Sequence, residues 1–330
     1  MRCPSRHPFA HESCLPYSFP PELLEFPMAF VPVRFSRVLA WCLFAFLVSV
    51  NFAFAQDSTK QDQQDQGAIV APPAKLIFDA KLEAALRHAV YEKRGTKEPL
   101  TEDDLRKVFV LEADGQDIAD LRGLQYCRNL HLLKLSNNKI TDISPLADLP
   151  RLQSLDLKNN QIEDISPLAS DTALQYLELS GNQVGDISAV AKLQNLSALY
   201  LADNSVADLS PLAELPKLKS LYLERNQVTD LSPLKNVTGL TSLDLTGNQV
   251  ADLSPLNQQT QLRYLLVEDN KLADLAALVK FASEDAAGSR RVAPFLNLYI
   301  AGNPLSEAAK SDQLAALKEA GVRVHEEPAR

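Results

Sequence analysis

Tyrosine and carboxylate side chains recur at matching positions along the middle of this 330-residue chain. Tyrosine offers a large contact area for a small loss of conformational entropy, and carboxylates attract basic groups. Tyr200 and Tyr222 are 22 residues apart in the sequence. Such a combination suits the binding of another molecule. The candidate binding residues are Tyr176, Glu178, Tyr200, Tyr222, Glu224, Asp244, Tyr264 and Glu268.

The sequence does not support catalytic chemistry. Its histidines beyond residue 75 are His88, His131 and His325, and their spacing does not bring them together. There is no nucleophile elbow, H-E-x-x-H zinc helix, Walker loop or dinucleotide-binding glycine motif. Glu224 and Asp244 have the right groups for acid and base work, but the pattern predicts no pocket around them. We therefore predict a protein that is not an enzyme and that has no cofactor and no metal.

An asparagine column indicates which elements position the candidate residues. Seven asparagines recur every 22 residues, each closing the pattern L-x-x-L-x-L-x-x-N, and an eighth follows 33 residues later. This register predicts an α/β solenoid of leucine-rich repeats, in which each coil is one strand and one return segment. The asparagine amides are expected to bond backbone groups of adjacent coils. The column is Asn138, Asn160, Asn182, Asn204, Asn226, Asn248, Asn270 and Asn303.

Side chains alternate along a strand, which divides each repeat between core and surface. With Leu177 in the core, Tyr176 and Glu178 project from the concave face of a parallel sheet. Neighbouring strands are about 4.8 Å apart, so Tyr200 and Tyr222 are expected side by side. The alternative is that tyrosine simply suits an exposed strand and that the acids keep the sheet soluble.

Each coil continues with the phrase I/L-x-D-I/L-S-P-L, which predicts the return segment. Serine caps a short helical turn and proline presets its backbone angle, which sends a leucine such as Leu146 inward. The aspartates suggest a metal ladder, but calcium needs six to eight converging oxygens. Bonds from each aspartate to backbone amides at the turn explain the column better. The column is Asp120, Asp142, Asp164, Asp186, Asp208, Asp230, Asp252 and Asp274.

The N-terminal side of the repeats follows a different pattern. Residues 56–75 are polar and rich in glutamine, which predicts a disordered linker. Residues 76–110 predict a helical cap, with Asp79 as the N-cap of one helix and Thr101 opening a second helix in a capping box. This cap covers the open end of the repeats at 111–303.

The C-terminal side contains a break in register and a second cap. An insertion at about 279–294 separates the last coil from the others. Residues 304–330 are predicted to form a capping helix near 312–319 and a tail, with Gly321 ending the helix.

An export signal is predicted near the N-terminus. Residues 28–55 carry a basic start, an apolar run and an A-x-A site, so a signal peptidase is expected to cleave after Ala55. The alternative is a membrane anchor formed by 38–55. Residues 1–27 fit neither segment and are predicted to be untranslated or disordered, with Met28 as the alternative start.

Charge and cysteine content restrict the partners further. A formal net charge of −9 argues against a nucleic-acid partner. Of the four cysteines, only Cys127 follows the predicted cleavage site, so the exported chain forms no intramolecular disulfide. Contact with a membrane is expected only transiently, through the signal peptide.

The repeat L-x-x-L-x-L-x-x-N-x-I-x-D-I-S-P-L after a helical cap resembles the internalin-like class of bacterial exported leucine-rich repeat proteins, over residues 76–324. The resemblance implies a horseshoe or arc with a parallel concave sheet and short helical or 3-10 return segments. It also implies recognition of a protein or peptide across the concave sheet, and the acids favour a basic partner. We expect a periplasmic or extracellular location. The alternative function is a structural cell-envelope protein that self-associates.

Overall fold

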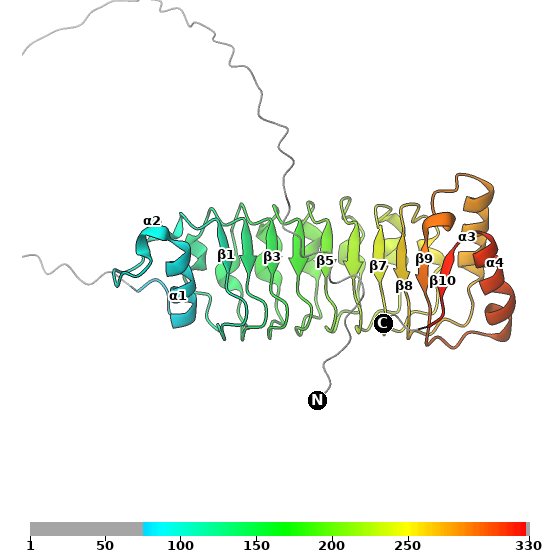
Figure 1. Ribbon diagram of the computed structural model, residues 1–330, viewed down its shortest axis with the longest axis horizontal. Coiled ribbons are helices and arrows are strands. Elements are labelled where there is room, and N and C mark those ends of the chain that lie inside the picture. Colours follow the sequence, from blue (N-terminus) through cyan, green and yellow to red (C-terminus); the bar gives the residue numbers. More distant parts are fainter. Residues whose placement is uncertain (1–74, 328–330) are drawn as a thin grey trace, which may run out of the picture. The chain divides into compact units, whose positions relative to one another are not determined.

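The computed structural model describes residues 75–327, and within them ten short strands form one sheet (Figure 1). Neighbouring strands run parallel and follow one another in sequence order. The predicted leucine-rich repeat solenoid is therefore confirmed. The strands are β1 (Val110–Glu112), β2 (Leu132–Lys134), β3 (Ser154–Asp156), β4 (Tyr176–Glu178), β5 (Ala198–Tyr200), β6 (Ser220–Tyr222), β7 (Ser242–Asp244), β8 (Tyr264–Leu266), β9 (Asn297–Tyr299) and β10 (Arg323–His325).

Leucines at the centre of the strands hold the coils together. Leu155, Leu177 and Leu199 are partners in adjacent strands, and each is 0% exposed. A second leucine two residues later, such as Leu201, is equally buried. Burying one such side chain contributes roughly 1.5–3 kcal/mol. Because every coil repeats the pattern in register, the leucines form one continuous core along the stack.

The return segments of the repeats are short 3-10 turns. Asp142 accepts a hydrogen bond from the backbone N–H of Ser144 at 2.8 Å, and the other aspartates of the column make equivalent bonds. The predicted role of serine is wrong, because the aspartate two residues earlier caps the turn and the serine hydroxyl does not. The turns are η2 (Leu124–Tyr126), η3 (Ser144–Leu146), η4 (Ser166–Ser170), η5 (Ser188–Lys192), η6 (Ser210–Leu212), η7 (Ser232–Asn236) and η8 (Ser254–Leu256).

The asparagine column links neighbouring coils through side-chain hydrogen bonds. The amide nitrogen of Asn226 donates to the backbone oxygens of Leu201 at 2.8 Å and Leu223 at 3.1 Å. Its side-chain oxygen accepts from the backbone N–H of Val206 at 2.9 Å. Similar bonds recur along the column. Each asparagine thus satisfies buried backbone groups of two coils.

The N-terminal cap uses the two helix starts predicted from the sequence. Asp79 accepts hydrogen bonds from two backbone N–H groups of the first turn, and Thr101 forms a capping box with Asp104. Leu82 and Leu86 are buried in the core. Both predicted start signals are confirmed. The cap consists of α1 (Ala80–Ala89), η1 (Tyr91–Lys93) and α2 (Glu102–Leu105).

The predicted insertion at 279–294 contains most of a helix, α3 (Ala276–Ala287), followed by the turn η9 (Ala293–Phe295). Asp285, near the end of α3, accepts hydrogen bonds from the backbone N–H groups of Val292 and Ala293, both at 2.9 Å. The extra residues are therefore a folded unit fastened by one buried carboxylate.

The C-terminal end differs in part from the prediction. The helical segments η10 (Ala309–Gln313) and α4 (Leu314–Glu319) cover the last coils, and Gly321 follows with a φ of +102°. After it, β10 pairs with β9 in the same parallel register as the repeats. The predicted cap and tail did not include this strand. It was missed because its residues lack the leucine pattern.

The predicted export signal at 28–55, the segment 1–27 and nearly all of the linker at 56–75 lie outside the described residues. Along the part of the chain that is described, every helix is too short or too polar to span a bilayer.

Candidate binding surface

One surface of the sheet carries the predicted binding residues. In β1 to β9, the first and third residues of each strand project from it, on either side of the buried central leucine, and so does the residue two positions further on. In β10 the central residue is Val324, which is half-buried. Figure 1 shows the strands side by side in sequence order, so these positions form rows across the sheet. The part of this surface on β4 to β10 is named the tyrosine face here, and it bears Tyr176, Tyr200, Tyr222, Tyr264 and Tyr299.

Three tyrosines of this face are in contact. Tyr200 and Tyr222 are partners in adjacent strands, and their rings stack with centroids 4.7 Å apart and planes 6° apart. Tyr176 lies tilted against Tyr200, at 5.3 Å and 43°. All three side chains are half-buried. The predicted contact between Tyr200 and Tyr222 is confirmed, and the three rings form a partly exposed aromatic surface.

The four carboxyl groups predicted beside the tyrosines are buried. The register places Asp244 next to Tyr222, so a large neighbouring side chain lies beside the smaller acid. Their burial argues against the alternative expectation that these acids keep the sheet soluble, because solubility depends on exposed charge. The exposed fractions are 7% for Glu178, 7% for Glu224, 1% for Asp244 and 5% for Glu268.

Burial changes the acid–base properties of two of these groups, Asp244 and Glu178. It raises the pKa of Asp244 to about 6, against the effect of a hydrogen bond from the backbone N–H of Thr246 at 2.9 Å. The charge of Glu268 raises this pKa further, whereas a side-chain hydrogen bond with Glu224 lowers it. Burial also raises the pKa of Glu178. These two carboxyl groups therefore ionise at a higher pH than exposed ones.

Burial also raises the pKa of Tyr200 to about 12, with smaller contributions from the negative neighbours, and it raises the pKa of Tyr222. Both rings thus carry neutral hydroxyl groups near pH 7. A neutral phenol donates and accepts hydrogen bonds, and its ring offers a flat apolar surface. Contact and hydrogen bonding are the chemistry that these residues supply.

A second aromatic pair lies further along the tyrosine face. The rings of Tyr299 and His325 stack at 4.2 Å with planes 8° apart. Tyr264, on β8, is half-buried and has Asn297 as its partner on β9. Sequence reasoning gave His325 no role, because β10 was not predicted. The alternation of Val322 and Val324 with polar residues was the available signal for that strand.

The first three strands present charged residues instead. Lys134 and Glu112, partners in β2 and β1, form an ion pair of 2.8 Å. On β3, burial raises the pKa of Asp156. Exposed ion pairs contribute only about 0–1 kcal/mol to stability. The same sheet surface therefore changes from charged on β1 to β3 to aromatic on β4 to β8.

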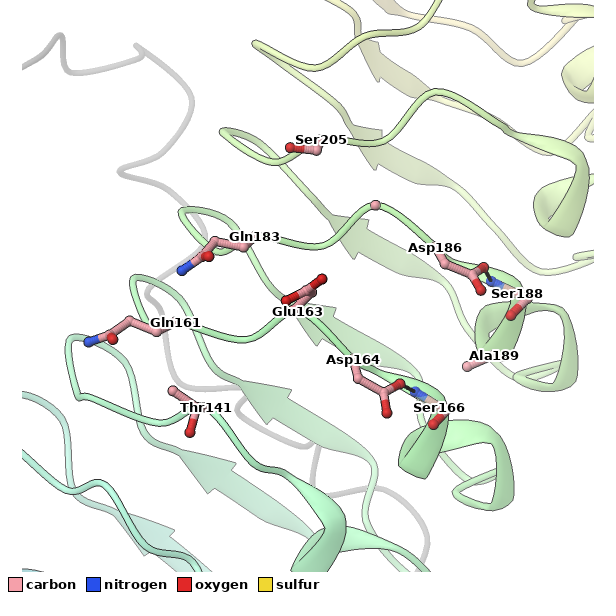
Figure 2. A pocket seen from close by; sticks show the side chains of 11 residues that line it. Thr141, Gln161, Glu163, Asp164, Ser166, Gln183, Asp186, Ser188, Ala189 and Ser205 are labelled. Atoms are coloured by element: carbon pink, nitrogen blue, oxygen red, sulfur yellow. Dashed lines mark hydrogen bonds between the residues drawn. The ribbon is translucent and has the colours of Figure 1, made fainter.

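A hollow of about 880 Å³ lies elsewhere, among the return segments, and none of its lining residues belongs to the tyrosine face. Figure 2 shows Asp164 pointing to Ser166 and Asp186 pointing to Ser188. Each carboxylate accepts a hydrogen bond of 2.8 Å from the backbone N–H of that serine. These carboxylates are therefore engaged in capping turns. The lining residues are Thr141, Gln161, Glu163, Asp164, Ser166, Gln183, Gly185, Asp186, Ser188, Ala189 and Ser205.

Comparisons with known proteins agree with this architecture. Family models of leucine-rich repeats match residues 128–170, 194–236, 150–206 and 238–253. The comparison with curated protein sequences gave no match. An internalin (InlF) from Listeria monocytogenes is similar in structure, with a TM-score of 0.64 and 29% identity over 78% of each chain. Internalin C2 of the same species is 31% identical, with a TM-score of 0.55 over 76% of this chain and 93% of its own.

This chain belongs to the internalin-like leucine-rich repeat proteins. A leucine-rich repeat protein from Leptospira interrogans shares the fold of this internalin-like chain, with a TM-score of 0.53 and 19% identity over 67% of this chain and 62% of its own. Leucine-rich repeat proteins generally mediate protein–protein recognition, on a scaffold that is typically not enzymatic.

Proposed function

We propose that this internalin-like protein is an exported, non-enzymatic module that recognises a basic protein or peptide through the tyrosine face. This face is part of the sheet surface that the sequence analysis predicted to be concave. The observation that carries the proposal is the contact of Tyr176, Tyr200 and Tyr222 on three neighbouring strands. A short peptide or a loop of a larger partner is long enough to cover all three rings.

The tyrosine stack has the properties of an interface anchor. Its rings are held by each other and by the sheet, so a partner orders few side chains when it binds. Aromatic residues are enriched among the positions that dominate binding energy, where one side chain is worth about 2 kcal/mol or more. The half-buried state of these rings leaves area for a partner to cover.

Charge favours a basic partner. Glu178, Glu224 and Asp244 lie among the tyrosines, and no lysine or arginine occupies the first or third position of β4 to β8. Negative charge held near an aromatic ring strengthens the attraction of a cation that lies over that ring. An arginine or lysine side chain of the partner placed on Tyr200 or Tyr222 satisfies both features.

The proposal of export rests on the sequence of residues 28–55. A basic start, an apolar run and small residues before Gln56 are typical of a cleaved secretory signal. The proposal that the protein is not an enzyme rests on the sequence, which has separated histidines and none of the catalytic motifs considered. The raised pKa of Tyr200 fits this proposal, because its hydroxyl group is not an activated nucleophile at neutral pH.

Site-specific photocrosslinking tests this function. A photoreactive residue replaces Ser220, which lies on β6 between the small partners Ala198 and Ser242 on the tyrosine face. The matched control carries it at Gln183, which lines the hollow among the return segments. We expect one partner to be crosslinked from Ser220 and not from Gln183, and to be lost in a Tyr200→Ala/Tyr222→Ala background. Equal crosslinking from both positions, or none from Ser220, would contradict the proposal.

Self-association in the cell envelope is the second candidate function. Arg290 and Arg291 are exposed after α3, where they could meet the acidic surface of another copy. Sedimentation velocity at low and high salt distinguishes the two functions. An oligomer that dissociates at high salt supports self-association, and a monomer at both salt concentrations excludes it.

A further inference from the structure

A buried aspartate interrupts an otherwise mainly apolar column on the return side of the repeats. Asp171 directly follows η4 and is 0% exposed. The equivalent residues in most other coils are buried and apolar, so they need no polar partner. They are Cys127, Leu149, Leu193, Leu215 and Val237.

Asp171 supports an unusual turn in the preceding coil. Asp148 has a left-handed backbone, with a φ of +62°, which directs the next N–H group away from its own coil. The N–H of Leu149 donates to Oδ1 of Asp171 at 2.9 Å, and the N–H of Asp148 donates to Oγ of Ser170 at 3.1 Å. In a regular coil, the N–H of Leu193 instead donates to the oxygen of Val190 in its own coil, at 2.9 Å.

One oxygen of this carboxyl group is unsatisfied. Oδ2 of Asp171 is buried and has no hydrogen-bond partner. Burial raises the pKa of Asp171 to about 7; the bond from Leu149 acts in the opposite direction, and the charge of Asp148 adds to the increase. The other charged groups on the packed segments are Arg151 on the preceding coil and Lys192 on η5, and both are exposed.

We propose that Asp171 is a pH-sensitive clasp between two coils, which holds the segment of Asp148 and Leu149 closed while its carboxyl group is neutral and loosens that segment when the carboxylate forms. A buried carboxylate with one unsatisfied oxygen is unfavourable, and opening of the clasp exposes it to water. The affected segment continues into β3, whose first residue is Ser154, while Asp171 itself precedes β4, whose first residue is Tyr176.

The direction of the pH effect follows from the raised pKa. The folded clasp keeps its proton at a pH where the opened segment has lost it, so the clasp is most stable at acid pH. Its stability falls as pH rises from the ordinary range near 4 to about 7, and it is constant above that. Within this window the opening constant increases about tenfold per pH unit.

Amide hydrogen exchange, read by NMR between pH 5 and 8, tests the clasp in the whole protein. The Asp148 and Leu149 amides are followed in the natural protein and in Asp171→Asn, which keeps an acceptor but does not ionise. The Leu193 amide provides the reference for base-catalysed exchange. After correction for base-catalysed exchange, we expect the opening constant at the two amides to rise by about tenfold per pH unit up to pH 7 in the natural protein. In the variant it should not change with pH. Identical profiles in both proteins would overturn the proposal.

Two further measurements separate ionisation from simple structural support. Carbon-13 NMR of the Asp171 carboxyl group in the natural protein should show a midpoint near 7, and a midpoint below 5 would overturn the proposal without any variant. Asp171→Leu restores the apolar column but removes the acceptor of Leu149. It should remove the pH dependence while accelerating exchange at Leu149 at every pH. A pH dependence that persists in Asp171→Leu would assign the effect to another group.

Discussion

Replacing Asn226 by alanine should loosen the stack of coils at its centre. Asn226 is 8% exposed, and its side chain bonds groups in two neighbouring coils. The amide donates to the backbone oxygens of Leu201, Leu223 and Glu224, and its oxygen accepts from the N–H of Val206. Alanine removes all four contacts and leaves the strand sequence unchanged.

The loss of stability can be worked out from these contacts. The N–H of Val206 makes no other hydrogen bond in the structure, and Val206 is 0% exposed, so the variant buries an unsatisfied donor. Such a donor costs about 1–3 kcal/mol, and the lost bonds to carbonyl oxygens add roughly 0.5–1.5 kcal/mol each. Because a carbonyl oxygen often retains a second partner, we expect a total loss of about 3 kcal/mol.

Urea unfolding followed by circular dichroism measures this loss. The matched control is Asn236→Ala, since Asn236 is an exposed asparagine at the end of η7. The control should stay within about 0.5 kcal/mol of the natural protein, as surface substitutions do. If Asn226→Ala also stayed within that range, the reasoning that the asparagine column fastens the coils would be refuted.

Three further substitutions test other parts of the account. Leu201→Asp should unfold the protein at room temperature, because a buried unpaired charge costs several kcal/mol, and an unchanged thermal melt would reverse the inward assignment. Asp244→Asn should reduce the fall in unfolding free energy between pH 5 and 8 by up to about 1.4 kcal/mol, because the raised pKa of about 6 makes ionisation unfavourable in the folded state and about one pH unit of this effect lies above pH 5. Melting temperatures at the two pH values would show the change, and an equal fall in both proteins would exclude Asp244. Gly181→Ala should destabilise the protein more than Gly95→Ala, although both glycines have a φ of +71°, because only the first places a methyl group against Asn159. Equal losses of unfolding free energy, measured by urea unfolding, would show that backbone strain alone matters.

The period of the sequence was sufficient to predict the stacking of the tyrosines. A fixed interval of 22 residues between strands aligns Tyr200 with Tyr222, and the regular coil leaves no freedom to shift that register. The helix starts at Asp79 and Thr101 were equally predictable, because capping depends on residues within one turn. Local and periodic features were therefore accessible from the sequence.

Features that depend on neighbouring coils could not be predicted from the sequence. The burial of Asp244 depends on the size of side chains on adjacent strands, which no single repeat reveals. The same applies to Asp171, whose partner Leu149 lies one coil away. β10 escaped prediction for a different reason, since Arg323 to His325 pair through backbone groups and carry no leucine.

The central claim is that the tyrosine face binds the partner, and the affinity of the crosslinked partner for matched variants tests it most directly. Tyr176→Ala, Tyr200→Ala and Tyr222→Ala are compared by calorimetry with Tyr91→Ala, which removes a tyrosine that is 79% exposed on the N-terminal cap. We predict that at least one face variant weakens binding by about thirtyfold, equivalent to about 2 kcal/mol, while Tyr91→Ala binds like the natural protein. Unchanged affinity in all three face variants, with their melting temperatures intact, would contradict the account.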